Sequence, residues 1–174
     1  MESVREWLNN PRGDGYGHGF GDGLKSFCGR PVYDIDGVQT LIYKIRFGFA
    51  VGAILNRDLT TTPCFIAKGG GYFAHGATPR EAREALTEKL FDGMDEGERI
   101  AAFWECHNRE EKYSGRDLWI WHHRLTGSCE MGRNQFAADR GIDIDGSAFT
   151  VAEFVELCKD AYGGATVRRL MGGG

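Results

Sequence analysis

The sequence predicts an α+β protein, with a small antiparallel sheet of about four strands followed by four to five helices packed on one face. Two observations predict this class. Residues 31–75 alternate apolar and polar side chains between turn signals, whereas residues 78–162 carry helix-capping motifs and apolar residues at helical spacing. Because strands and helices are segregated along the chain, the pattern favours α+β over a parallel βαβ fold.

The strands are predicted from hairpin signals and alternation. Asp36-Gly37 separates the strands at 31–35 and 38–47 and is typical of a two-residue hairpin turn. In the second strand, the odd-numbered residues from Leu41 to Phe47 are expected to form the covered face, with Thr40 on the wetter one. Two further strands are expected at 49–55 and 64–68, and three glycines at 69–71 separate them from a short run at 72–75.

The helices are predicted from their first turns and their apolar stripes. Thr78-Pro-Arg-Glu81 and Thr150-Val-Ala-Glu153 are capping boxes, each followed by apolar residues three and four positions apart. Other helices are expected from Asp95, over 116–125 and over 128–140, with the last helix ending at Gly163-Gly164.

The domain prediction is one α+β domain over 31–170, with a leader at 1–30 and a disordered tail at 171–174. Glycine stands at every second position from Gly13 to Gly23, which favours a flexible segment because glycine has the largest backbone entropy to lose.

Composition favours an ordered, cytoplasmic protein. The 174 residues are 41% hydrophobic, which suits a buried core, and no stretch approaches the roughly 20 apolar residues of a membrane span. The first eight residues lack the apolar region of a signal peptide. Five widely spaced cysteines do not form a disulfide framework, so reduced, mostly buried thiols are expected.

Charge argues against nucleic acid as a direct ligand. The formal net charge is −4, and residues 78–112 carry ten acidic and six basic side chains. Such a surface repels phosphates and suits a basic partner.

Three ligand-binding motifs are not met by the sequence. The alternating glycines never give G-x-G-x-x-G, and no Gly-Lys-Ser/Thr tripeptide occurs, which excludes both nucleotide motifs. Asp143-Ile-Asp145-Gly146 resembles part of a calcium loop, but positions one and twelve would be Gly141 and Ala152. No metal or cofactor is therefore expected.

Histidines and cysteines leave one chemical alternative open. His122, His123 and Cys129 could form a thiol- or metal-dependent centre, with Cys129 near a predicted helix N-terminus. The spacing lacks C-x₂-C and H-x₃-H, and His122 lies on an apolar helix stripe, which favours a buried, hydrogen-bonded histidine. No catalytic residue is assigned.

Two segments resemble a family encoded by phages and mobile elements of gut Firmicutes. One is Asn56–Leu90, with Thr62-Pro-Cys-Phe-Ile-Ala-Lys-Gly69 and Tyr72-Phe-Ala-His-Gly76. The other begins at Trp121-His-His-Arg-Leu-Thr-Gly-Ser-Cys-Glu-Met-Gly-Arg133 and continues through Phe149–Leu157 to Ala161-Tyr-Gly-Gly164. Some such proteins are anti-CRISPR inhibitors of type II-A systems.

This resemblance implies a stoichiometric, cofactor-free inhibitor that binds Cas9 or its guide-RNA complex and blocks target DNA binding or cleavage. The alternatives are the thiol- or metal-dependent enzyme and a phage structural or housekeeping module. The candidate partner-binding residues lie in the glycine-rich leader, on the acidic helical surface and beside the paired histidines: Tyr16, His18, Phe20, Asp92, Asp95, Glu96, Glu98, Trp119 and His123.

Overall fold

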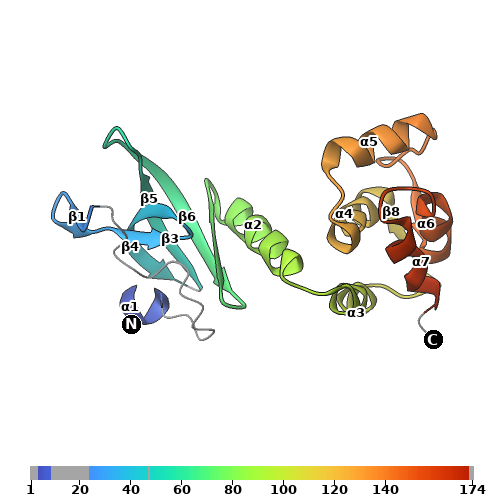
Figure 1. Ribbon diagram of the computed structural model, residues 1–174, viewed down its shortest axis with the longest axis horizontal. Coiled ribbons are helices and arrows are strands. Elements are labelled where there is room, and N and C mark those ends of the chain that lie inside the picture. The colour runs from blue at the N-terminus through green and yellow to red at the C-terminus, as the bar shows by residue number, and fades with distance from the viewer. Residues whose placement is uncertain (1–3, 9–23, 47, 173–174) are drawn as a thin grey trace. The chain divides into compact units, whose positions relative to one another are not determined.

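The computed structural model describes residues 4–8, 24–46 and 48–172, and these residues adopt an α+β fold, as predicted. The protein folds as two compact units, Met1–Leu90 and Phe91–Gly174. Figure 1 shows the strands β3 to β7 in the first unit and the helices α3 to α7 in the second. We call them the sheet unit and the helical unit and describe each by itself; the single domain over 31–170 stays a prediction.

The sheet unit is built on a five-stranded antiparallel meander, one strand more than predicted. Its strands are paired in sequence order: β3 (Tyr33–Ile35), β4 (Val38–Arg46), β5 (Phe49–Leu55), β6 (Thr61–Gly69) and β7 (Tyr72–Gly76). Asp36 and Gly37 have φ of 56° and 75°, so the predicted hairpin turn is of type I′. A two-stranded ribbon, β1 (Ser26–Phe27) with β2 (Arg30–Pro31), precedes the sheet.

Both faces of this sheet are covered, because alternate side chains of each strand enter different cores. On one face Ile66 and Phe73 pack with Trp7 and Leu8 of α1 (Val4–Leu8). On the other face, Ala67, Ala74 and Phe65 pack with α2 (Pro79–Asp92). The predicted leader at 1–30 thus contributes a buried helix turn, whereas residues 9–23 lie outside the described residues.

The predicted alternation of β4 is wrong at its centre. The pairing with β5 shifts between Ile42 and Lys44, which inserts Tyr43 as an extra residue and reverses the faces. Tyr43 is therefore exposed, and Thr40 is fully buried. Thr40 donates its hydroxyl to the Val38 carbonyl and accepts from His75 Nε2 at 3.0 Å.

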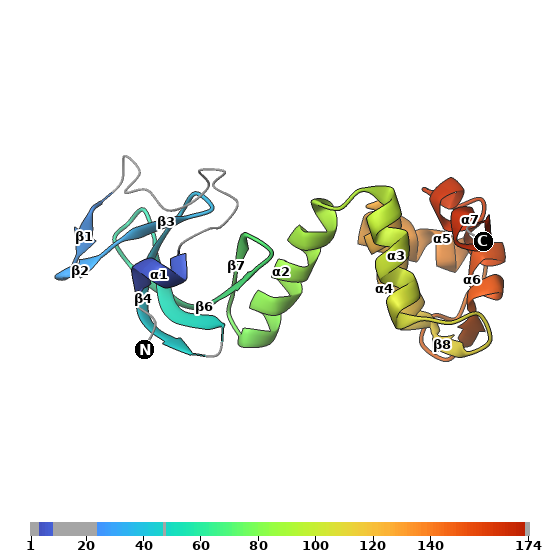
Figure 2. The ribbon, with the colours of Figure 1, turned by 90° about the horizontal axis from the view of Figure 1, so that it is seen from below.

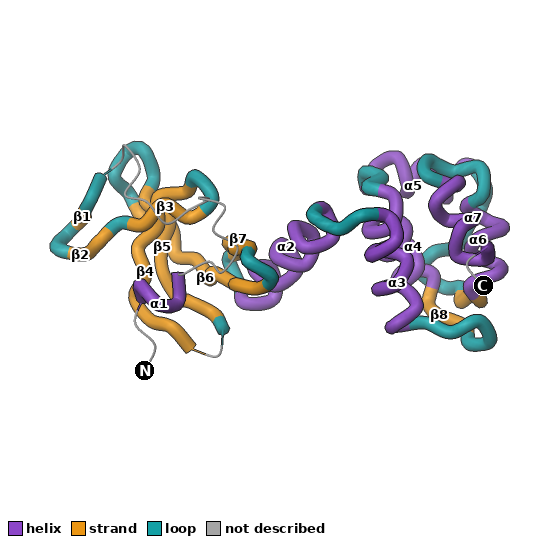
Figure 3. Tube along the Cα trace, turned by 60° about the horizontal axis from the view of Figure 1, so that its bottom comes forward, coloured by secondary structure: helices purple, strands orange, loops and turns teal. Residues whose placement is uncertain are grey.

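The helical unit has a core of its own, so the helices that follow α2 pack on one another. It comprises α3 (Glu96–Cys106), α4 (Gly115–Thr126), α5 (Glu130–Asp139), α6 (Val151–Cys158) and α7 (Gly164–Gly172). Phe103, Leu118, Phe154 and Leu170, from four of these helices, are each at most 1% exposed. Figures 2 and 3 show α3 beside α4 in this unit.

A short β-ribbon aligns the starts of two helices. β8 (Lys112–Ser114) pairs with β9 (Ala148–Thr150), and Ser114 and Thr150 are the N-caps of α4 and α6. Thr150 forms the predicted capping box with Glu153. Neither this ribbon nor α7 was predicted. The helix α7 was missed because the glycine pair at 163–164 was interpreted as the end of the last helix.

Candidate functional site

An apolar cavity of the helical unit lies between α4, α5 and the turn before α7, and we call it the α4–α5 pocket. Its volume is about 400 Å³, within the usual range for small-ligand sites. Trp119 and His122 line it from α4, and Arg133 and Phe136 from α5, together with Ala161 and Tyr162, the connection 127–129 and Gly132.

A short connection between α4 and α5 brings the polar members of the pocket together. Gly127 ends α4 in a left-handed conformation, with φ of 70°, and donates its N–H to the His123 carbonyl at 2.7 Å. Cys129 already caps α5, so only three residues join the two helices. This connection places Ser128 Oγ 2.8 Å from His122 Nδ1.

Hydrogen-bond partners identify the proton position on His122. The ring is 3% exposed, and burial, with Arg133 and His123 nearby, lowers the pKa of His122 to about 4, so it is neutral. Among the described residues, Ser128 Oγ has no acceptor other than His122 Nδ1. The arrangement that satisfies the hydroxyl is donation from Ser128 to Nδ1, which leaves the proton on Nε2.

Two nitrogens of the pocket wall therefore carry unused hydrogens. Trp119 Nε1 and His122 Nε2 are buried and have no hydrogen-bond partner in the described part of the protein. Their rings lie with centroids 5.9 Å apart and planes 25° from parallel. Because each unsatisfied buried donor costs about 1–3 kcal/mol, the pair is stabilised by any acceptor that reaches it.

The lowered pKa of His122 predicts a loss of stability in mild acid. The unfolded chain, with a pKa near 6.5, binds more protons than the fold between pH 6.5 and about 4. The stabilisation is thus complete above pH 6.5 and falls by about 2 kcal/mol between pH 7 and pH 5. We expect the His122→Gln variant to lack this part of the pH dependence of stability, measured by urea unfolding at pH 7 and pH 5. If the variant shows the same difference in stability between the two pH values as the original protein, the lowered pKa of His122 is contradicted.

The interaction that the structure shows for the Cys129 thiol is that of a helix cap. Its Sγ accepts from the Gly132 N–H at 3.4 Å as the cap of α5. His122 Nδ1 is engaged by Ser128 Oγ, and His123 Nδ1 donates to the Ser128 carbonyl at 2.8 Å. The structure thus brings these predicted residues into one region, but joins the histidines to Ser128.

The side chains that a metal ion would require are also not grouped in the described part of the protein. Within the described residues, no three His, Cys, Asp or Glu side chains are close enough to hold an ion. All five cysteines are free thiols, and only Cys64 and Cys158 are buried, so the prediction of mostly buried thiols is wrong. Burial raises the pKa of the Cys158 thiol to about 12.

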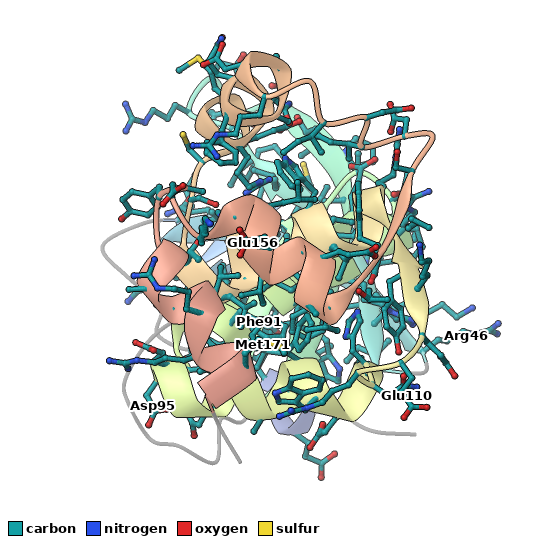
Figure 4. All side chains as sticks on the ribbon, turned by 90° about the vertical axis from the view of Figure 1, so that its right-hand side faces the viewer. Arg46, Phe91, Asp95, Glu110, Glu156 and Met171 are labelled. Atoms are coloured by element: carbon teal, nitrogen blue, oxygen red, sulfur yellow. The ribbon has the colours of Figure 1, made fainter. Side chains whose placement is uncertain are left out.

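The acidic candidates have local structural partners. Asp95 and Glu98 form a capping box at the start of α3, where Figure 4 labels Asp95. Glu96 accepts from Arg169 at 2.6 Å, whereas Asp92 is an exposed residue at the end of α2. Much of this acidic charge therefore stabilises helix ends and the α3–α7 contact.

The remaining candidates lie in two regions. Tyr16, His18 and Phe20 lie outside the described residues. Trp119 is 6% exposed and forms part of the pocket wall, and His123 is half-buried and adjoins the pocket residue His122 in sequence.

The sequence interpretation missed Ser128, Arg133 and Tyr162 as members of the site. Their signal was the Gly-Ser-Cys turn, which marks the junction of two helices but does not indicate what packs against it.

Comparisons with known proteins identify no relative: no family model, curated protein or solved structure matches this sequence. The described residues also contain no helix with the length and apolar character needed to cross a membrane. The family resemblance therefore stays a prediction.

Proposed function

We propose that this protein is a binding protein that docks on a partner protein through the face around the α4–α5 pocket. The observation that carries the proposal is a set of exposed apolar side chains on the elements that border this pocket. Ile120 of α4, Met131 of α5 and Tyr162 before α7 are 43%, 81% and 74% exposed. Large apolar side chains exposed on a surface in this way are typical of interaction sites.

Two of these side chains line neighbouring cavities. Tyr162 lines the α4–α5 pocket, and Ile120 lines a second cavity of about 360 Å³ that shares Trp119 and Arg133 with it. Met131 lies in the first turn of α5, between Glu130 of the second cavity and Gly132 of the first. Tyrosine, methionine and arginine are enriched in protein interfaces, and tyrosine and arginine frequently dominate their binding energy.

Binding accounts for the pocket better than catalysis does. A general base works best with a pKa near the operating pH, whereas the pKa of His122 is about 4. Ser128, its partner, is 5% exposed and so is poorly placed to attack a substrate. The cavity therefore offers hydrogen-bond donors and apolar surface but lacks an activated nucleophile on Ser128.

The specific partner that we propose is Cas9 or its guide-RNA complex in the bacterial cytoplasm, as the family resemblance predicts. Inhibition would then be stoichiometric and would need no cofactor. Cas9 cleavage of a target duplex, titrated with this protein, tests the proposal. Complete inhibition near equimolar protein is expected; inhibition far below it would favour catalysis at Cys129, and no inhibition would remove Cas9 as the partner.

Two substitutions test the docking face in the same assay. We expect Met131→Glu combined with Tyr162→Glu to raise the half-inhibitory concentration at least about tenfold, because a buried charge opposes docking. Leu59→Glu is the matched control, since Leu59 is an exposed apolar residue of the sheet unit, at 54%. Equal potency of the double variant and the control would exclude the proposed face.

A further inference from the structure

We propose that the group held in the α4–α5 pocket is an apolar carboxylate, that is, an aromatic or branched body ending in a carboxylate. The inference rests on the proposed function and names the chemistry that its pocket accepts. Phe136, Ala161 and Tyr162 form apolar walls around a cavity of about 400 Å³. These walls favour an apolar body of the ligand.

The polar end of the ligand is indicated by the two unused donors. Trp119 Nε1 can only donate, and His122 Nε2 carries a hydrogen when Ser128 donates to Nδ1. A ligand oxygen acceptor satisfies both, whereas a donor group satisfies neither. Both atoms are covered from solvent, so a ligand reaches them only when the side chains that cover them move.

The sign of the charge is indicated by Arg133. Among the described lining residues, Arg133 is the charged one, and its Nη1 group donates to the Ser128 carbonyl at 2.6 Å. Its positive charge also helps to lower the pKa of His122. Because a positive site with two N–H donors favours an anionic acceptor, a carboxylate fits better than an amide or an alcohol.

Two sources supply this chemistry. One is a free organic acid, and the other is the C-terminal residue of a partner protein. N-acetyl-phenylalanine carries the aromatic body, the peptide group and the carboxylate of a protein C-terminus, N-acetyl-phenylalanine amide lacks only the charge, and 3-phenylpropionate lacks the peptide group.

The experiment follows the indole N–H resonances of the ¹⁵N-labelled full-length protein. The protein has four tryptophans, and Trp119→Phe identifies the Trp119 signal. We expect N-acetyl-phenylalanine to shift this signal and to bind at least about tenfold more tightly than its amide. Equal affinity of acid and amide overturns the carboxylate assignment, and so does the absence of any shift up to the solubility of the acid.

Three arginine variants separate the effect of the positive charge at position 133 from an effect on folding. Arg133→Gln should abolish the difference between acid and amide, whereas Arg133→Lys should retain most of it. Arg168→Gln is the matched control, because Arg168 also donates Nη1 to a backbone carbonyl, that of Lys159 at 2.7 Å, and does not line the pocket. A preference for the acid that persists in Arg133→Gln overturns the role of Arg133 and with it the inference.

The remaining outcomes distinguish the two sources of the carboxylate, and they separate a failure of this inference from a failure of the proposed function. Tighter binding of N-acetyl-phenylalanine than of 3-phenylpropionate supports a protein C-terminus, and equal binding supports a free acid; both support the carboxylate. If acid and amide bind equally at Trp119, the pocket still binds ligands and only its preference is excluded. Failure of the docking variants to affect Cas9 inhibition, by contrast, rejects the proposed docking face and leaves the probe result standing.

Discussion

Replacement of Phe103 by alanine should lower the free energy of unfolding of the helical unit by about 3–5 kcal/mol. Phe103 is fully buried at the centre of the α3–α4 contact. Its ring stacks on His107 at 4.2 Å between centroids and meets Trp121 edge-on at 5.4 Å. The truncation removes these contacts and leaves a cavity that rigid neighbouring rings cannot fill.

The loss of stability is increased because the Phe103 ring also supports His107. His107 Nδ1 donates to the Phe103 carbonyl at 2.9 Å, and Nε2 lies 2.8 Å from Asp117 Oδ2 in the first turn of α4. The stacked ring therefore joins the end of α3 to the start of α4. Without Phe103, the imidazole loses the surface that holds it in this position.

Urea unfolding followed by tryptophan fluorescence measures the effect, because Trp104, Trp119 and Trp121 all belong to the helical unit. Since typical domains are stable by about 5–15 kcal/mol, the variant should lose a large share of the stability of this unit. Ile120→Ala, on an exposed position of α4, is the control and should change stability by less than about 0.5 kcal/mol. A similar small change for Phe103→Ala would show that the unit does not depend on this contact.

Gly76→Ala should destabilise the sheet unit, with a loss of about 1–3 kcal/mol or more. A Cβ at Gly76 would lie 2.2 Å from the Ala82 nitrogen and 2.7 Å from the Glu81 carbonyl carbon. Both are backbone atoms of the first turn of α2, so no side-chain rotation relieves the overlap. The helix must move away from β7 and from Ala67 and Ala74 beneath it.

Thermal unfolding of the full-length protein measures this loss, and hydrogen exchange of the β6 and β7 amides localises it. Gly172→Ala is the control, because a Cβ at that position meets nothing within 4 Å. We expect the melting temperature of Gly76→Ala to fall by several degrees and that of the control to change little. Equal melting temperatures for the two variants would contradict the close approach of β7 and α2.

The predictions that the structure confirms depend on residues close together in sequence. The Asp36-Gly37 turn requires only two adjacent residues with positive φ. The capping box at Thr150 joins it to Glu153, three positions away. Helical and alternating periodicity likewise act within a few residues, so strands, helices and their order could be predicted from the sequence alone.

The features that were missed depend on partners far apart in sequence. Thr40 is buried beside His75, 35 residues away, because the bulge at Tyr43 exchanges the two faces of the strand. The β8–β9 ribbon pairs Lys112 with Thr150, and no local pattern specifies that choice of partner.

The same distinction separates the parts of the candidate site. The amino-acid sequence by itself determined that His122 and Cys129 flank a junction between two helices, because the end of one helix and the start of the next are local properties of Gly127 and its neighbours. Tertiary packing determined that His122 is buried against Ser128 and that Ala161 and Tyr162 close a cavity beside it. Burial sets the pKa of the histidine and its unused N–H, and burial depends on segments some 30 to 40 residues further along the sequence.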